Sequence, residues 1–230
     1  MGRGKSPARF QALIEAATRV FIDLGYRRTQ MADVAAAMGV AKGTVYLYVE
    51  SKEALFDLSV RQVSGSLRSA AVELPYATPP PGATLREVEA RIAAESSLPA
   101  LAKALETKKP RDVRVELESI LRELYALLSR NRVAIKLIDR CAHDHPELAS
   151  VWYRAGRVHH LSLLERYLAS EGRRAELRAL PSPAIAARML LETITFWAVH
   201  RYWDPAPQEV DDQVAEESVI AFLLGALVKE

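Results

Sequence analysis

The residues best suited to chemistry lie in one short stretch, Lys42-Gly43-Thr44-Val45-Tyr46-Leu47-Tyr48, with Lys52 close behind it. Lysine ammonium groups, threonine and tyrosine hydroxyls and the amides at a helix start are the donors that grip phosphates in nucleic acids. A glycine near a helix start weakens the helix but lets its backbone approach another surface closely. The stretch therefore predicts a nucleic-acid contact. We expect five of its residues to face outward: Lys42, Gly43, Thr44, Tyr46 and Tyr48.

A second group with possible chemistry is Cys141, His143, Asp144 and His145, which are residue types that bind metals. The two histidines are not four residues apart on a helix, and Pro146 interrupts the helical geometry. His145-Pro146-Glu147 is more typical of a helix boundary, and Cys141 lies in an apolar helical stretch. We therefore expect no metal site and no cofactor, and we expect Cys141 to be a small core residue.

Aromatic and histidine side chains gather in the C-terminal half of the chain. An apolar cavity with a few polar groups is what a small-molecule site requires. The candidates for such an effector site are Trp152, Tyr153, His159, Met189, Thr193, Phe196, Trp197 and His200. Each of them could equally be a core or interface side chain, so the pattern favours a pocket without fixing its lining.

Residues 42–48 can bind phosphates only if a scaffold positions them, and the sequence just before them predicts such a scaffold. Apolar residues recur at helical spacing at Met31, Val34, Ala35 and Met38. Gly39 follows at once, where a helix end often needs the positive φ that glycine adopts without penalty. Helix, glycine turn and helix is the pattern of the helix-turn-helix motif, whose second helix enters the DNA major groove. We expect Val40, Val45 and Val49 to fill the angle between the helices.

From Phe10 to Phe56 the sequence resembles the N-terminal DNA-binding domain of the TetR family of transcriptional repressors. The resemblance rests on Ala16-Ala17, Phe21, Gly25-Tyr26, Thr29, Met31 to Ala35, Gly39-Val40, Lys42 to Tyr46, Tyr48 and Ser51 to Phe56. The sequence departs from the family pattern at Gln30, where a second threonine or serine usually caps the helix. Glutamine caps less compactly, so we expect Thr29 to take over that role.

The resemblance also implies which residues contact DNA: Arg28, Thr29, Lys42, Gly43, Thr44, Tyr46, Tyr48 and Lys52. It implies that residues 42–44 approach bases and backbone in the major groove, and that the two tyrosines contact phosphates, with Tyr48 reaching a base edge. Lys52 would pair with a phosphate, and Arg28 and Thr29 would lie where the first DNA-facing turn begins, beside Arg27. Arg3 and Lys5 would either follow the minor groove or form a solvated tail.

The rest of the chain also has helical periodicity, and alternation typical of strands is absent. The sequence predicts an all-α fold of about nine or ten helices, with a three-helix DNA-binding domain over residues 1–52 and a larger helical effector-binding and dimerisation domain over 53–230. Ser6 and Pro7 should start the first helix and Gly25 should end it, whereas Ser51 should cap a helix that continues to about Ala71. Prolines break residues 74–83, and Thr84-Leu85-Arg86-Glu87 is typical of a capping box. Further helices are expected near 113–128, 132–142, 147–171, 183–203 and 208–228.

The last predicted helix is apolar nearly all round from Val219 to Val228. A helix of this kind must be buried on more than one side. Its place at the chain end favours a subunit interface, where Gly225 and Ala226 permit close approach, although an internal helix of the monomer is the alternative. The family resemblance implies a homodimer that joins through the last two helices of each chain.

The composition is that of an ordinary globular protein, with 50% hydrophobic and 26% charged residues among 230 and a net charge of +2. Basic residues outnumber acidic ones over residues 1–52, and the reverse holds over 205–230, as expected if DNA binds near one end of the chain. A single cysteine excludes a disulfide framework and favours a reducing compartment, the cytoplasm. The sequence shows neither a signal-peptide core nor an apolar run that could span a membrane.

These observations favour a ligand-responsive transcriptional regulator, most plausibly a repressor, that binds a palindromic operator as a dimer and is released by a small apolar or amphipathic effector. We do not expect an enzyme, because the sequence has no phosphate-binding glycine loop, nucleophile elbow or metal-ligand spacing. Two alternatives remain at this point. One is a helical small-molecule-binding protein or enzyme without specific DNA binding, and the other is an architectural or activating DNA-binding protein without an effector.

Overall fold

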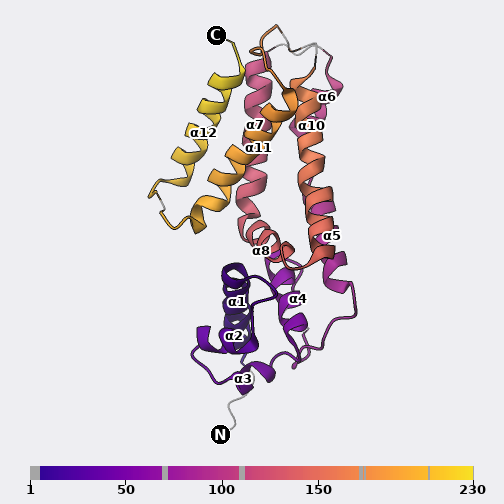
Figure 1. The fold of residues 1–230 in the computed structure, drawn as a ribbon, viewed down its shortest axis with the longest axis vertical. Coiled ribbons are helices and arrows are strands. Elements are labelled where there is room, and N and C mark those ends of the chain that lie inside the picture. Colours follow the sequence, from indigo (N-terminus) through magenta and orange to yellow (C-terminus); the bar gives the residue numbers. More distant parts are fainter. Residues whose placement is uncertain are drawn as a thin grey trace. The chain divides into compact units, whose positions relative to one another are not determined.

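The structure is a computed structural model, and it describes residues 6–68, 72–108, 112–170, 173, 175–206 and 208–229. Within these residues the chain forms helices throughout, with no strand and only two isolated bridges, Val49 with Tyr76 and Leu177 with Val228 (Figure 1). The fold is therefore all-α, with an N-terminal helix-turn-helix domain and a larger helical domain, as predicted. Arg3 and Lys5, the predicted minor-groove tail, lie outside the described residues.

The helices are α1 Pro7–Leu24, α2 Met31–Ala37, α3 Lys42–Tyr46, α4 Lys52–Val63, α5 Ala83–Glu95, α6 Pro99–Glu106, α7 Val113–Arg130, α8 Arg132–Ala142, α9 Pro146–Val151, the π-helix η2 Trp152–Val158, α10 His159–Leu168, α11 Pro183–Ala198, the 3-10 helix η4 His200–Trp203 and α12 Asp212–Leu227. The predicted helix over 147–171 is thus a continuous run of α9, η2 and α10. None of the described helices is long and apolar enough to cross a membrane.

The described residues form two compact units. The N-terminal unit comprises residues 1–94 and 133–153, and the C-terminal unit comprises 95–132 and 154–230. In this division the N-terminal unit includes α4, which packs along α1, and also residues 133–153. Cys141 of α8, for example, places its thiol 3.8 Å from the carbonyl oxygen of Phe21.

The N-terminal unit is built around α1. Ser6 occupies the N-cap position with Pro7 in the first turn, and Gly25 ends the helix at φ 83°, as predicted. The apolar side of α1 buries Phe10, Leu13, Ile14, Ala17 and Phe21 against its neighbours. The next long helix, α4, is capped as predicted, because the Ser51 hydroxyl accepts a hydrogen bond from the amide of Ala54 at 3.1 Å. The prediction that this helix reaches Ala71 is wrong, since α4 ends at Val63 and Gly65 follows with φ 70°.

The C-terminal unit packs α6, α11 and α12 against α7, and α10 against both α6 and α11. The amphipathic pattern predicted for residues 113–128 is the reason, because α7 buries one continuous apolar side. The residues fully buried on that side are Val113, Leu117, Ile120, Leu121 and Leu124. In Figure 1, α11 and α12 run side by side next to α7.

Candidate nucleic-acid interface

The turn between α2 and α3 has the predicted geometry. Gly39 takes φ 65° immediately after the Met38 cap, and the amide of Val40 donates to the carbonyl of Ala35 at 3.0 Å. Space beside Gly39 is open, so its positive φ rather than a close contact is what requires glycine there. The turn directs the chain into α3 with the buried Val45 facing the rest of the unit.

The side of α3 that packs inward consists of Val45, Tyr48 and Val49, all of which are buried. The prediction that Tyr48 faces outward is wrong: only 3% of this residue is exposed, and its ring stacks on Phe10 of α1 with the ring centroids 6.2 Å apart. The physical reason is helical geometry. Residue 48 lies three positions after Val45 and shares its face, whereas residues 46 and 48 point in nearly opposite directions. Tyr48 therefore holds α3 against α1.

The outward side of α3 carries the other predicted contacts. Lys42, Gly43 and Tyr46 are exposed, and Thr44 is half-buried. No atom lies within 4 Å of the position that a side chain at Gly43 would occupy. An exposed ammonium, a phenol and a bare backbone at a helix start can together bind a phosphate and approach a groove floor.

The start of α2 differs from its prediction. The N-cap is Gln30, whose backbone amide donates to the Asp33 carboxylate at 2.8 Å, and the hydroxyl of Thr29 does not cap this helix. Thr29 is buried, and its hydroxyl donates to the carbonyl of Gly25 at 2.7 Å. Gln30 and Asp33 form a capping box at the start of α2, and Thr29 closes the preceding turn instead. The predicted DNA contact at Thr29 therefore faces the interior, whereas Arg27 and Arg28 are exposed.

Lys52 is half-buried and already has a partner within the N-terminal unit. Its ammonium donates to the carbonyl of Tyr26 at 3.1 Å and lies 4.6 Å from the centre of the Tyr26 ring. The Tyr26 hydroxyl donates to Glu53 at 3.1 Å, and burial together with that carboxylate raises the pKa of Tyr26, which keeps the phenol protonated. A lysine ammonium has three N–H groups, so Lys52 can bind a phosphate while it also donates to Tyr26. Its phosphate contact stays a prediction.

A segment distant in sequence supports the chain just after α3. The amide of Tyr76 donates to the carbonyl of Tyr48 at 2.7 Å, and the amide of Glu50 donates to the carbonyl of Tyr76 at 3.1 Å. The Tyr76 hydroxyl in turn donates to the fully buried carboxylate of Asp57 on α4 at 2.7 Å. The residues that follow α3 are thus fixed by hydrogen bonds to Tyr76 and Thr78.

Asp57 was missed in the sequence because a lone aspartate on an apolar helix has no motif around it. Its carboxylate also accepts from Thr84 at 2.7 Å and from Arg61 at 2.6 Å, and Arg61 pairs with Glu87 at 3.2 Å. The capping box predicted for Thr84 to Glu87 is therefore wrong. The helix begins one residue earlier, at Ala83, and the Thr84 hydroxyl binds Asp57 instead of capping.

The residues considered as possible metal ligands, Cys141, His143, Asp144 and His145, lie at a helix boundary. His145 occupies the N-cap of α9, and Pro146 opens that helix, as predicted. Cys141 is fully buried, which confirms that it is a core residue, and burial raises the pKa of its thiol to about 12. Within the described ranges, no three His, Cys, Asp or Glu side chains are grouped so as to hold a metal ion.

The eight predicted effector residues are divided between the two units. Trp152 and Tyr153 belong to the N-terminal unit, where the Trp152 indole donates to Asp139 at 3.4 Å. The other six belong to the C-terminal unit: His159, Met189, Thr193, Phe196, Trp197 and His200. Of these, Met189 is 65% exposed, and Phe196 and His159 are also exposed. Trp197, His200 and Thr193 are half-buried, and Trp197 meets Phe196 edge to face at 5.7 Å. Met189 and Phe196 thus face outward in the single chain, and the effector site stays a prediction.

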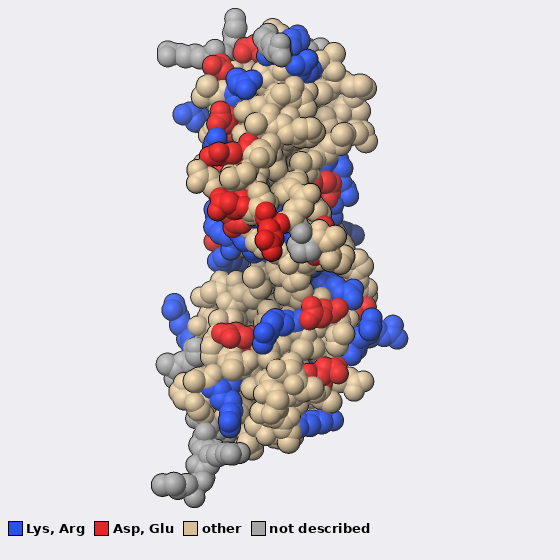
Figure 2. Space-filling view, turned by 90° about the vertical axis from the view of Figure 1, so that its left-hand side faces the viewer, with Lys and Arg blue, Asp and Glu red and all other residues tan. Residues whose placement is uncertain are grey.

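The large apolar side chains that are exposed on α11 and α12 make up a set that we call the α11–α12 face. It consists of Ile185, Met189, Phe196, Val214 and Phe222, and all five are exposed. Phe222 is 68% exposed, and Gly225 beside it has open space where a side chain would project. Figure 2, which views the side of the molecule that carries α12, shows an uncharged area over this unit with charged side chains around it. Several large apolar side chains exposed on two neighbouring helices are more typical of a protein interface than of a surface that stays in water.

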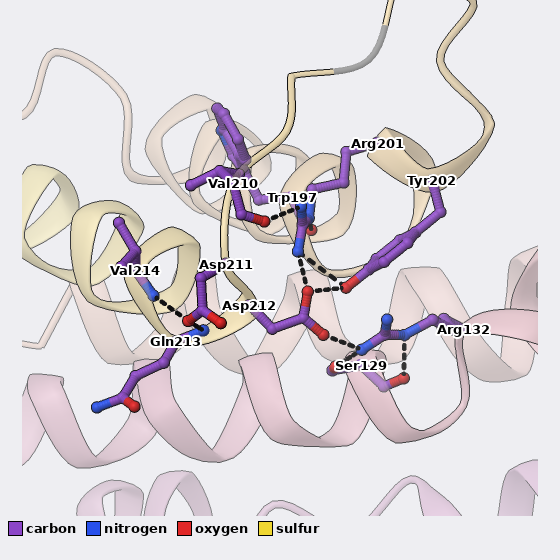
Figure 3. A network of polar contacts seen from close by, with 10 residues as sticks. All are labelled: Ser129, Arg132, Trp197, Arg201, Tyr202, Val210, Asp211, Asp212, Gln213 and Val214. Atoms are coloured by element: carbon purple, nitrogen blue, oxygen red, sulfur yellow. Dashed lines mark hydrogen bonds and ion pairs between the residues drawn. The ribbon is translucent and has the colours of Figure 1, made fainter.

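A polar network fixes the start of α12 (Figure 3). The Asp212 carboxylate accepts from Arg201, from the Tyr202 hydroxyl at 2.5 Å and from Arg132 at 3.2 Å. The Tyr202 ring also lies within 4.0 Å of the Arg132 guanidinium and 4.4 Å of the Arg201 guanidinium, measured to the ring centre. The hydrogen bond from Tyr202 lowers the pKa of Asp212, so this carboxylate stays charged at neutral pH. The network holds η4, the start of α12 and Arg132 at the start of α8 in one arrangement, and thereby positions the α11–α12 face.

Comparisons with known proteins agree with this geometry. Residues 13–58 match the family model described as bacterial regulatory proteins, tetR family. An uncharacterized HTH-type transcriptional regulator of Bacillus subtilis, YhgD, is 45% identical over 49 residues, which are 21% of this chain and 26% of that protein. The HTH-type transcriptional regulator BetI of Rhizobium meliloti is 38% identical over 69 residues, 30% of this chain and 34% of that protein. The sequence match thus spans about a quarter to a third of these relatives.

The fold of the whole chain resembles that of a solved regulator structure. The ketosteroid transcriptional regulator KstR2 of Mycobacterium tuberculosis superposes with a TM-score of 0.55 over 99% of this chain and 98% of that one. The identity is 16%, so the likeness is one of fold. The helix-turn-helix followed by a larger helical domain is therefore an arrangement that this chain shares with a known regulator.

Proposed function

Because this chain belongs to the TetR family of transcriptional regulators through its N-terminal domain, we propose that it binds a palindromic operator as a homodimer and represses transcription until a small effector binds. The observation that carries the proposal is the outward side of α3, where Lys42, Gly43 and Tyr46 are exposed on a helix fixed from behind by Tyr48. We infer that α3 enters the major groove, with Lys42 and Tyr46 on phosphates, and that the protein works in the cytoplasm, where the DNA lies.

The dimer is proposed from the α11–α12 face. A single chain leaves Met189, Phe196 and Phe222 exposed together, and covering them with a second copy removes that apolar area from water. A two-fold interface uses the same patch on both chains and closes the assembly at two. Two copies of α3 would then read two half-sites separated by about 34–36 Å or a multiple of it, which is why the operator should be palindromic.

The effector response is proposed from the path of the chain. Residues 133–153 belong to the N-terminal unit, although the segments before and after them belong to the C-terminal unit. Their contacts reach the end of α1, since the Arg140 guanidinium donates to the carbonyl of Leu24 at 3.4 Å and Asp144 accepts from the amide of Arg27 at 3.2 Å. An effector that changes the packing of α7 or α10 therefore displaces residues 133–153, which contact the end of α1 next to the helix-turn-helix. Release requires that the effector bind the DNA-free arrangement more tightly than the DNA-bound one.

The proposal predicts the salt dependence of a Lys42→Ala variant. A lysine that neutralises a phosphate releases a counterion, so its loss should weaken binding to all DNA sequences and lower the salt slope by about 1 per chain. The measurement is operator affinity by fluorescence anisotropy at several salt concentrations.

The matched control is Lys103→Ala, which removes the same charge from an exposed position on α6 in the other unit. We expect this variant to keep the wild-type salt slope. Equal salt slopes of the operator affinity for wild type, Lys42→Ala and Lys103→Ala would show that Lys42 does not contact DNA.

A further inference from the structure

The outward side of α3 and of the residue that ends it carries one exposed side chain that is purely apolar, Leu47. Leu47 follows Tyr46 with helical backbone angles, φ −70° and ψ −19°, and 53% of it is exposed. Residues 43, 46 and 47 are spaced by three and four positions and therefore share one face, opposite the buried Val45 and Tyr48. Leu47 thus lies on the same surface as the predicted DNA contacts.

A leucine on this surface needs an apolar partner. DNA offers phosphates, sugars and polar base edges, and the apolar group that projects into the major groove is the 5-methyl group of thymine. Gly43, one helical turn before Leu47, presents no side chain, and the space beside it is open. The helix can therefore approach the groove floor at this point closely enough for Leu47 to reach a base.

We propose that Leu47 reads the 5-methyl group of a thymine in each operator half-site, an inference that rests on the proposed operator binding by α3. The neighbouring polar groups then position the helix on the backbone, and Leu47 selects the base by excluding water from the methyl group. A cytosine or guanine at that position would place a polar base edge against the leucine side chain, and that base edge would then lack a hydrogen-bond partner. The operator should accordingly carry a thymine at one symmetric position of both half-sites.

The test replaces thymine by deoxyuridine, which removes only the methyl group and keeps the base pair. Each thymine of the best-bound operator is replaced in turn, symmetrically in both half-sites, and the affinities of wild type and Leu47→Ala are measured at one salt concentration. For wild type we expect one symmetric pair of thymines whose replacement weakens binding about fourfold per half-site, the factor that corresponds to burying one methyl group. For Leu47→Ala the same replacement should have no effect.

Leu47→Met serves as the matched control, because it keeps an apolar side chain of similar size and should keep the sensitivity to deoxyuridine. If every thymine replacement affects wild type and Leu47→Ala equally, the proposal for Leu47 is overturned, while specific binding by wild type still supports the operator-binding function. If wild type selects no specific site at all, both the reading by Leu47 and the proposed function are overturned.

Discussion

A Phe222→Glu variant is expected to be monomeric and to bind its operator at least about 100-fold more weakly than wild type, the order of the avidity gained by linking two binding modules. Phe222 is 68% exposed at the α11–α12 face, so within one chain the glutamate is solvated and the fold is retained. Between two chains, the same carboxylate would be buried without a partner, which costs far more than the lost apolar contact. Light scattering gives the oligomeric state, and anisotropy gives the operator affinity.

The control for this variant is Val158→Glu, which places the same charge on an apolar residue that is 57% exposed and belongs to neither α11 nor α12. It should remain dimeric and bind DNA as wild type does, and circular dichroism should show the same helix content in both variants. If Phe222→Glu were poorly folded, Met189→Glu would test the same face from α11. A Phe222→Glu protein that is folded, dimeric and fully active on its operator would place the dimer interface elsewhere.

Arg173→Ala is expected to lower the free energy of unfolding by about 3–5 kcal/mol, the cost typical of breaking one side of a buried ion pair. Arg173 is 1% exposed, and its guanidinium donates to Glu116 at 2.6 Å, to the Ser170 hydroxyl at 3.0 Å and to the carbonyl of Ala104 at 2.5 Å. Two helices of the C-terminal unit, α6 and α7, and the residues just after α10 thus meet at this one side chain. Its removal takes the charged donor away from the largely covered carboxylate of Glu116, which is 17% exposed, and leaves the Ala104 carbonyl with the amide of Thr107 alone. Denaturant unfolding followed by circular dichroism measures the loss.

Two further variants separate the ion pair from general effects of substitution. Arg166→Ala on α10 removes an exposed arginine and should change stability by no more than about 0.5 kcal/mol. The double variant Arg173→Met with Glu116→Leu replaces both charges by apolar groups and should recover most of the stability lost by Arg173→Ala. A loss for Arg173→Ala no greater than that for Arg166→Ala would show that the buried guanidinium contributes little.

The local features of the fold could be predicted from the sequence because they depend on neighbouring residues. Gly39 after an apolar helix gives the turn, Ser51 gives a cap, and Pro146 marks a helix start. The burial of Tyr48 could also be predicted locally, since Val45 and Tyr48 are three positions apart and a buried Val45 predicts a buried Tyr48. The cap at α2 was also encoded locally, in the Asp33 that follows Gln30 by three residues.

The long-range features could not be predicted in the same way. Asp57 meets Tyr76 and Thr84, and Arg173 meets Glu116, at sequence separations that no periodicity encodes. Met189 and Phe196 show a second reason why a sequence pattern does not determine what a side chain contacts. Their helical spacing indicates an apolar side of α11, but a pocket lining, a core and a subunit interface all require the same pattern. Only the tertiary arrangement shows that these two side chains face outward.

The most direct test of operator binding is to select genomic fragments with the purified full-length protein and to measure the affinity of the best fragment against salt. The account predicts a palindromic site with half-sites one or more helical turns apart, bound by a dimer far more tightly than unrelated DNA. Weak binding to all fragments alike, lost steeply with salt, would contradict it, because that result indicates only a basic surface without sequence recognition.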